Sequence, residues 1–317
     1  MGWLFQSPTA LHETDGSFAF YVASNNDLFA IKKRGTGTGK TEFHVLSAAT
    51  GYQQFSLQTG TALHETDDAF EFAVAENRDV FAFKKRGTGT GKTEIHVLSA
   101  ASGYQQFSLQ TGTALHETDD AFEFAVAENR DVFAFKKRGT GTGKTEIHVL
   151  SVASGYQQFS LQTGTALHET DSTFQFALAQ NRDVFAIKKS NTGTRSTEVH
   201  ILDVDQGYGA FSLQRKTALH ETDDAFCFGV TSDRDVLAVK RRGTGSNTTE
   251  VHIFTAEKVE WCVELRDART PIASPLERVT VHARTAAEAR IAVGSKIEHY
   301  VRVGVPLDVQ VLEGSCL

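Results

Sequence analysis

Two short motifs carry most of the chemistry that the sequence could perform. The first, GTGTGKT, spans 35–41 and recurs at 87–93 and 139–145. It resembles a phosphate-binding loop, which needs a glycine, four further residues and then Gly-Lys-Thr. The position of that first glycine is taken by Arg34, Arg86 and Arg138, and a strand pattern follows where a helix N-terminus should hold the phosphate. The motif therefore predicts a flexible hairpin loop and no nucleotide site.

The second motif is His-Glu-Thr-Asp, first seen at 12–15. No second histidine follows at helical spacing, which excludes a helical zinc-protease site. Its carboxylates are suited to accept backbone donors in turns. A further set of histidines falls in the middle of predicted strands, where packing or cross-strand pairing is expected: His44, His96, His148, His200 and His252. Neither these histidines nor the three cysteines predict a metal site, and no cofactor is expected.

These motifs sit in a strict internal repeat. The string TALHETD begins at Thr9, Thr61, Thr113, Thr165 and Thr217, each 52 residues after the last. Within the second copy, alternating apolar residues predict strands around 70–74, 80–83, 94–97 and 107–109, separated by Gly-, Asn- and Thr-rich connections. Residues 61–112 and 113–164 differ at a single position, Ala100 against Val152.

Four strands in every repeat of this length predict an all-β fold, a β-propeller of about five four-stranded blades. A linear β-solenoid is the alternative. We expect the propeller to cover 1–268, with repeats at 9–60, 61–112, 113–164, 165–216 and 217–268, and a divergent C-terminal tail at 269–317. Ring closure is left open, because 4–7 matches the fourth strand of a repeat, while 263–265 offers the fifth copy a fourth strand of its own.

In such a blade, the loop between the second and third strands and the crossover to the next blade emerge on the same face. Polar loops on a rigid scaffold commonly carry binding. The candidate ligand-binding residues are therefore His12, Glu13, Asp15, His64, Glu65, Asp67, His116, Glu117, Asp119, His168, Glu169, Asp171, His220, Glu221, Asp223, Thr36, Thr88, Thr140, Thr192 and Thr244. The tyrosines before the fourth strand are candidates for stacking on sugars: Tyr52, Tyr104, Tyr156 and Tyr208.

The stretch 181–194, NRDVFAIKKSNTGT, followed by TEVHIL at 197–202, resembles repeats of the integrin-type FG-GAP/VCBS propellers and related tandem-repeat lectins. The resemblance covers about 9–268 and implies extracellular recognition of glycans. Members often bind calcium just before the second strand. This sequence has Asn25-Asn26-Asp27, Asn77-Arg78-Asp79 or Asp233-Arg234-Asp235 there, which supplies too few oxygen ligands for calcium.

The composition and charge of the chain exclude some classes of binding partner. A formal net charge of −7 argues against nucleic acid. No apolar run is long enough to cross a bilayer, and no secretory signal is recognised at the N-terminus, so the compartment is left open. Because an active site needs unlike groups in separate roles and near-identical repeats supply the same residues to every blade, we expect no enzyme. The expected function is non-enzymatic, multivalent carbohydrate binding; the alternative is a protein–protein interaction scaffold without a small-molecule ligand.

Overall fold

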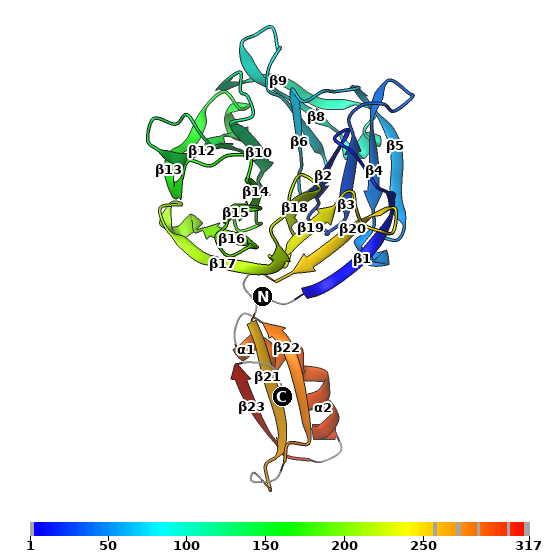
Figure 1. Cartoon of the computed structure of the whole chain (residues 1–317), viewed down its shortest axis with the longest axis vertical. Coiled ribbons are helices and arrows are strands. Elements are labelled where there is room, and N and C mark those ends of the chain that lie inside the picture. Colours follow the sequence, from blue (N-terminus) through cyan, green and yellow to red (C-terminus); the bar gives the residue numbers. More distant parts are fainter. Residues whose placement is uncertain (1–2, 256–258, 271–273, 284–285, 303–304, 314–317) are drawn as a thin grey trace. The chain divides into compact units, whose positions relative to one another are not determined.

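The computed structural model of the chain describes residues 3–255, 259–270, 274–283, 286–302 and 305–313. Five four-stranded antiparallel sheets are arranged as the blades of a propeller (Figure 1), which confirms the predicted fold class. Blade 1 is β2 to β5, blade 2 is β6 to β9, blade 3 is β10 to β13 and blade 4 is β14 to β17; blade 5 has the order β1-β20-β19-β18.

The strand bounds repeat closely from blade to blade. The first strands are β2 (Phe18–Val22), β6 (Phe70–Val74), β10 (Phe122–Val126), β14 (Phe174–Leu178) and β18 (Phe226–Val230). The second strands are β3 (Leu28–Lys32), β7 (Val80–Lys84), β11 (Val132–Lys136), β15 (Val184–Lys188) and β19 (Val236–Lys240). The third strands are β4 (Lys40–Leu46), β8 (Lys92–Leu98), β12 (Lys144–Leu150), β16 (Ser196–Leu202) and β20 (Thr248–Phe254). The outermost strands are β5 (Phe55–His64), β9 (Phe107–His116), β13 (Phe159–His168), β17 (Phe211–His220) and β1 (Trp3–His12).

Four single-turn 3-10 helices lie between the third and fourth strands: η1 (Ala48–Thr50), η2 (Ala100–Ser102), η3 (Val152–Ser154) and η4 (Val204–Gln206). Each ends at a glycine in the left-handed region, for example Gly51 at φ 60°. The outer strand is longer than expected, because it continues through Thr-Ala-Leu-His to His64 and its equivalents. The predicted crossover TGTALHETD is therefore mostly strand, and the turn to the next blade starts at the glutamate.

The core lies between neighbouring blades. Second strands are fully buried on both faces, as Leu28, Phe29, Ala30 and Ile31 show, because each sheet is covered by a blade on either side. Aromatic side chains bridge the blades, and the rings of Phe83 in blade 2 and Phe124 in blade 3 stack with their centroids 4.6 Å apart.

The pairing of the first strand of the chain with the last repeat closes the ring. β1 pairs with β20 as the outer strand of blade 5, so the N-terminal strand completes a sheet whose other strands come from the last repeat. The segment 263–265 lies instead in β21 (Val259–Asp267), which pairs with β22 (Glu277–Ala283) and β23 (Leu307–Glu313). The suggestion that it forms a blade strand is wrong.

The chain divides into two compact units, one of residues Phe5–Ile253 and one of Met1–Leu4 with Phe254–Leu317. The second unit contains the three-stranded sheet with the order β22-β21-β23 and two helices, α1 (Ala286–Ala292) and α2 (Gly294–Arg302). Its apolar cluster includes Val263, Leu265, Ala289 and Val293. No helix within the described residues is long and apolar enough to span a membrane.

Candidate functional site

The structure brings together two groups of the predicted loop residues. In every blade, the glutamate of the His-Glu-Thr-Asp motif accepts hydrogen bonds from the backbone N–H and the hydroxyl of a threonine in a Gly-rich loop. For Glu65 and Thr36 these distances are 2.7 and 2.8 Å. The equivalent pairs are Glu117–Thr88, Glu169–Thr140, Glu221–Thr192 and Glu13–Thr244. These bonds lower the pKa of each glutamate and tie the crossover to the hairpin loop of the preceding blade.

The other members of the motif occupy the same turns. The carboxylates at Asp15, Asp67, Asp119, Asp171 and Asp223 each accept the backbone N–H two residues ahead. The histidines His12, His64, His116, His168 and His220 end the outer strands and are exposed. These contacts fit a structural role in the turn, and the ligand-binding role of this set stays a prediction.

The aspartate before the second strand is also committed to protein contacts. Oδ1 of Asp79 accepts the N–H of Ala100 at 2.9 Å, and Oδ2 accepts Nδ2 of Asn77 and Nη1 of Arg130, both at 2.9 Å. Among the described residues, no three His, Cys, Asp or Glu side chains lie together as a metal would need. The tyrosines proposed for sugar stacking are buried in the interior, 2–3% exposed, so they cannot stack on a ligand.

The strongest candidate site lies elsewhere, in the central channel. The first strands of all five blades line a cavity of about 470 Å³, and Figure 1 shows these strands around the centre of the ring. The second residue of these strands has four types among the five blades: Ala19, Glu71, Glu123, Gln175 and Cys227. All five line the cavity. The repeat symmetry is therefore broken at the channel wall.

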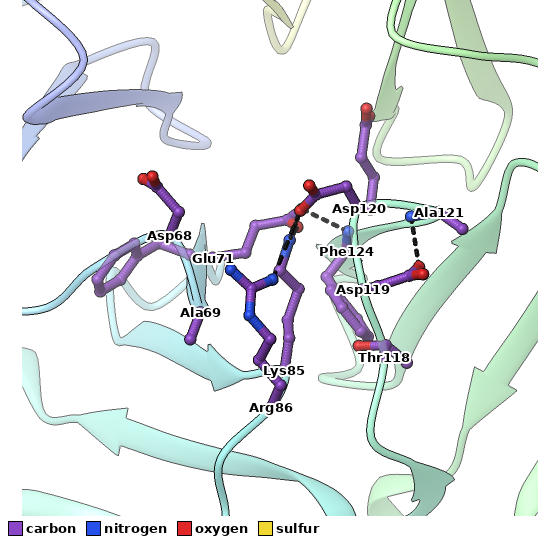
Figure 2. Close-up of polar contacts among 12 residues, drawn as sticks. Asp68, Ala69, Glu71, Lys85, Arg86, Thr118, Asp119, Asp120, Ala121 and Phe124 are labelled. Carbon is purple, nitrogen blue, oxygen red and sulfur yellow. Dashed lines mark hydrogen bonds and ion pairs between the residues drawn. The ribbon is translucent and has the colours of Figure 1, made fainter.

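Glu71 is a channel carboxyl group whose pKa is raised. Its Oε1 accepts the N–H of Phe124 from blade 3 at 2.7 Å, and its Oε2 lies 3.5 Å from Nζ of Lys85. Lys85 also lies 3.6 Å from Asp120, and Figure 2 shows these side chains together at the boundary of blades 2 and 3. Burial raises the pKa of Glu71 to about 7, with a smaller contribution from the negative charge of Glu123, while Lys85 opposes the shift.

Glu123 lies in a different environment on the neighbouring blade. Nζ of Lys137 donates to its Oε1 at 2.8 Å, and the N–H of Phe176 in blade 4 donates to its Oε2 at 2.8 Å. Among the carboxyl groups that line the channel, Glu71 and Glu123 on the first strands have unlike surroundings, one with a raised pKa and one in a close ion pair. Two such groups in a cavity are the arrangement that general acid–base chemistry requires.

These glutamates were not predicted as site residues, because each lies in an ordinary alternating strand with no local signature. Comparing the copies at one repeat position would have found them, since 19, 71, 123, 175 and 227 hold four different residue types. The premise that every blade offers the same residues is wrong at this position.

No protein-family model matches the chain, and no curated protein matches it. Among solved structures, it is similar to an α-L-arabinofuranosidase from Podospora anserina in complex with cellotriose, with 8% identity over 79% of this chain and 96% of that chain and a TM-score of 0.43. A β-xylosidase matches with 9% identity over 79% and 94% of the two chains and a TM-score of 0.46. A gluconolactonase from Xanthomonas campestris matches with 12% identity over 78% of each chain and a TM-score of 0.42.

The names describe those proteins, and each similarity has a TM-score below 0.5. Of the FG-GAP/VCBS resemblance, the five four-stranded sheets confirm the propeller architecture, and no family model matches the finer assignment. The predicted non-enzymatic function, whether multivalent carbohydrate binding or a protein scaffold, is contradicted, because it assumed the same residues in every blade, whereas the channel wall carries Glu71 and Glu123 beside the uncharged Ala19, Gln175 and Cys227. The unlike carboxyl groups of the channel remove the physical argument on which the prediction rested.

Proposed function

We propose that the chain is a hydrolase that cleaves a glycosidic bond in the central channel. The observation that carries the proposal is Glu71, a carboxyl group in the cavity whose burial raises its pKa to about 7, beside the second carboxyl group of Glu123. A carboxyl group that is partly protonated near neutral pH is a suitable general acid. Paired carboxyl groups in unlike environments are the basis of glycoside hydrolysis.

One oxygen of Glu71 is the better position for the acidic proton. Oε1 of Glu71 accepts the N–H of Phe124, so in the protonated form the proton is on Oε2, where the ion pair with Lys85 at 3.5 Å is then lost. That proton passes to the leaving oxygen as the glycosidic C–O bond breaks. A water molecule attacks the sugar carbon and gives its proton to the carboxylate of Glu123. Proton exchange with solvent then restores both groups, and the net reaction consumes one water.

The cavity offers surfaces that suit a sugar. Its lining combines the carboxyl groups with the rings of Phe18, Phe122, Phe174 and Phe226. Apolar rings beside a few polar groups are the usual lining of small-molecule sites, and a sugar presents C–H faces to the rings and hydroxyls to the carboxylates. About 470 Å³ is within the range of such pockets.

The test uses the wild-type chain, Glu71→Gln and the control Glu76→Gln, an exposed position after the same strand. Glycosides with a poor alkyl leaving group and with a dinitrophenyl leaving group are compared. We expect E71Q to lower kcat about 100-fold or more for the alkyl glycosides and much less for the dinitrophenyl glycosides, which leave without protonation. Hydrolysis by the wild type should fall as the pH rises above 7, because Glu71 then loses its proton.

Glu76→Gln should hydrolyse both substrates like the wild type. Equal rates for wild type and E71Q on alkyl glycosides would refute the assignment of Glu71. Failure of the folded wild type to hydrolyse any glycoside in a broad panel would refute the proposed reaction.

A further inference from the structure

A cation follows the second strand in every blade, and its surroundings differ around the channel. These residues are Lys33, Lys85, Lys137, Lys189 and Arg241. In blades 2 and 3 the cation pairs with a channel carboxylate, Lys85 with Glu71 at 3.5 Å and Lys137 with Glu123 at 2.8 Å. In blades 4 and 5 the equivalent channel residues are the neutral Gln175 and Cys227.

The positive charges of Lys189 and Arg241 are therefore only weakly balanced by negative charges nearby. Nζ of Lys189 lies 3.9 Å from Asp224, whose side chain is 84% exposed. Nη2 of Arg241 donates to the backbone oxygen of Asp224. Nε of Arg241 is buried and has no hydrogen-bond partner among the described residues. A buried, unpaired guanidinium N–H is costly, so the contacts within the protein leave the hydrogen-bonding capacity of Arg241 partly unused.

Both cations line the same cavity as Glu71 and Glu123. Their charges act together on Cys227: burial raises the pKa of its thiol to about 12, and the positive charges of Arg241 and Lys189 oppose that shift. Gln175 is neutral, and its amide is hydrogen-bonded to the backbone of Phe228 at both ends. In blades 4 and 5 the first strands thus offer these cations no carboxylate, and the acidic side chain that Lys189 approaches is the exposed Asp224, which also lines the cavity.

We propose that Lys189 and Arg241 form an anion subsite of the channel, which binds a negatively charged group of the substrate opposite the carboxyl pair. This inference rests on the proposed function in one respect: it makes the substrate of the hydrolase an acidic sugar. A guanidinium in a partly buried cavity suits a carboxylate, sulfate or phosphate. A neutral sugar would bring no negative charge to these two cations.

Binding is measured by titration calorimetry at constant ionic strength, with glucuronate, glucose, inorganic sulfate and inorganic phosphate as probes. The proteins are the wild type, Arg241→Gln, Lys189→Gln, Glu71→Gln and the control Lys33→Gln. Lys33 occupies the same repeat position but pairs with Asp68 at 3.0 Å and is not among the residues that line the cavity. Circular dichroism checks that each variant is folded.

We expect glucuronate to bind and glucose not to bind. R241Q and K189Q should each weaken glucuronate binding about tenfold or more, the loss typical of one charged hydrogen bond, while K33Q should bind like the wild type. Preferential binding of sulfate or phosphate with the same variant pattern keeps the subsite and changes the charged group to that oxyanion.

Equal binding of glucuronate and glucose, or equal loss in K33Q and R241Q, would overturn the subsite. If R241Q does not fold, K189Q alone carries the test. E71Q separates the two proposals, because it should lose hydrolysis of alkyl glycosides and still bind glucuronate. An active wild type without anion binding refutes the subsite alone, and anion binding without hydrolysis refutes the proposed reaction alone.

Discussion

Asp79 joins three segments of the propeller, and its replacement by alanine measures how strongly the blades are tied together. Its side chain is 8% exposed. It accepts the N–H of Ala100 and the side-chain donors of Asn77 and Arg130, each at 2.9 Å. Arg130 comes from the next blade, so one carboxylate holds a turn, a 3-10 helix and a neighbouring sheet.

Asp79→Ala removes both acceptor oxygens and with them all three hydrogen bonds. It leaves the N–H of Ala100 unpaired and Arg130 without its carboxylate. Breaking a buried ion pair from one side costs about 3–5 kcal/mol, against a total stability of about 5–15 kcal/mol for a typical protein. At about 2–4 °C per kcal/mol for a domain of this size, the melting temperature should fall by about 10 °C.

The assays are urea unfolding for the free energy and thermal melting for the melting temperature, both followed by far-ultraviolet circular dichroism, with Asp67→Ala as the control. Asp67 is an exposed turn aspartate that accepts the N–H of Ala69 at 2.8 Å, so its loss should cost about 1 kcal/mol. A loss in D79A no larger than that in D67A would refute the reasoning, since it would mean that the buried carboxylate contributes no more than a turn.

Two further predictions concern stability. Burial lowers the pKa of four mid-strand histidines, His44, His96, His200 and His252. The unfolded chain therefore binds protons at these histidines more readily than the folded chain, and the free energy of unfolding should decrease as the pH falls below about 6.5. The decrease is at most about 1.4 kcal/mol per pH unit for each histidine. Melting scans from pH 8 to 5 check this, and a flat profile would contradict it. Gly229→Ala should destabilise by about 1–3 kcal/mol, because its Cβ would meet Cγ2 of Val22 at 2.5 Å. Gly60→Ala, where no atom lies within 4 Å of an added Cβ, is the control in the same unfolding assay, and equal losses would argue against the clash.

The fold could be predicted because its signals are local and repeated. Alternation within 70–74 and the unbroken apolar run of 80–83 correctly indicated a half-covered first strand and a second strand buried on both faces. Ring closure could not be predicted in this way. Strand patterns in 4–7 and 263–265 were equally good, and only the pairing of β1 with β20 distinguished them.

The candidate site was predicted less well. The predicted site residues came from conspicuous loop motifs. In the structure, Glu65 and its equivalents already accept hydrogen bonds from threonines of the adjacent loop. Glu71 was overlooked because a glutamate between two phenylalanines reads as the solvent-facing residue of a strand. In a closed ring that face is turned to the channel, so the residue is partly buried and its pKa is raised.

The sequence by itself determined the blade. The alternation that marks each strand depends on neighbouring residues, and its recurrence every 52 residues gives the number of strands in a blade. The tertiary structure decided which strand closes the ring and which residues share the channel. Glu71, Glu123, Lys189 and Arg241 lie up to 170 residues apart, yet all line one cavity. Burial and charge, which set what these groups can do, are properties of that shared space and have no counterpart along the chain.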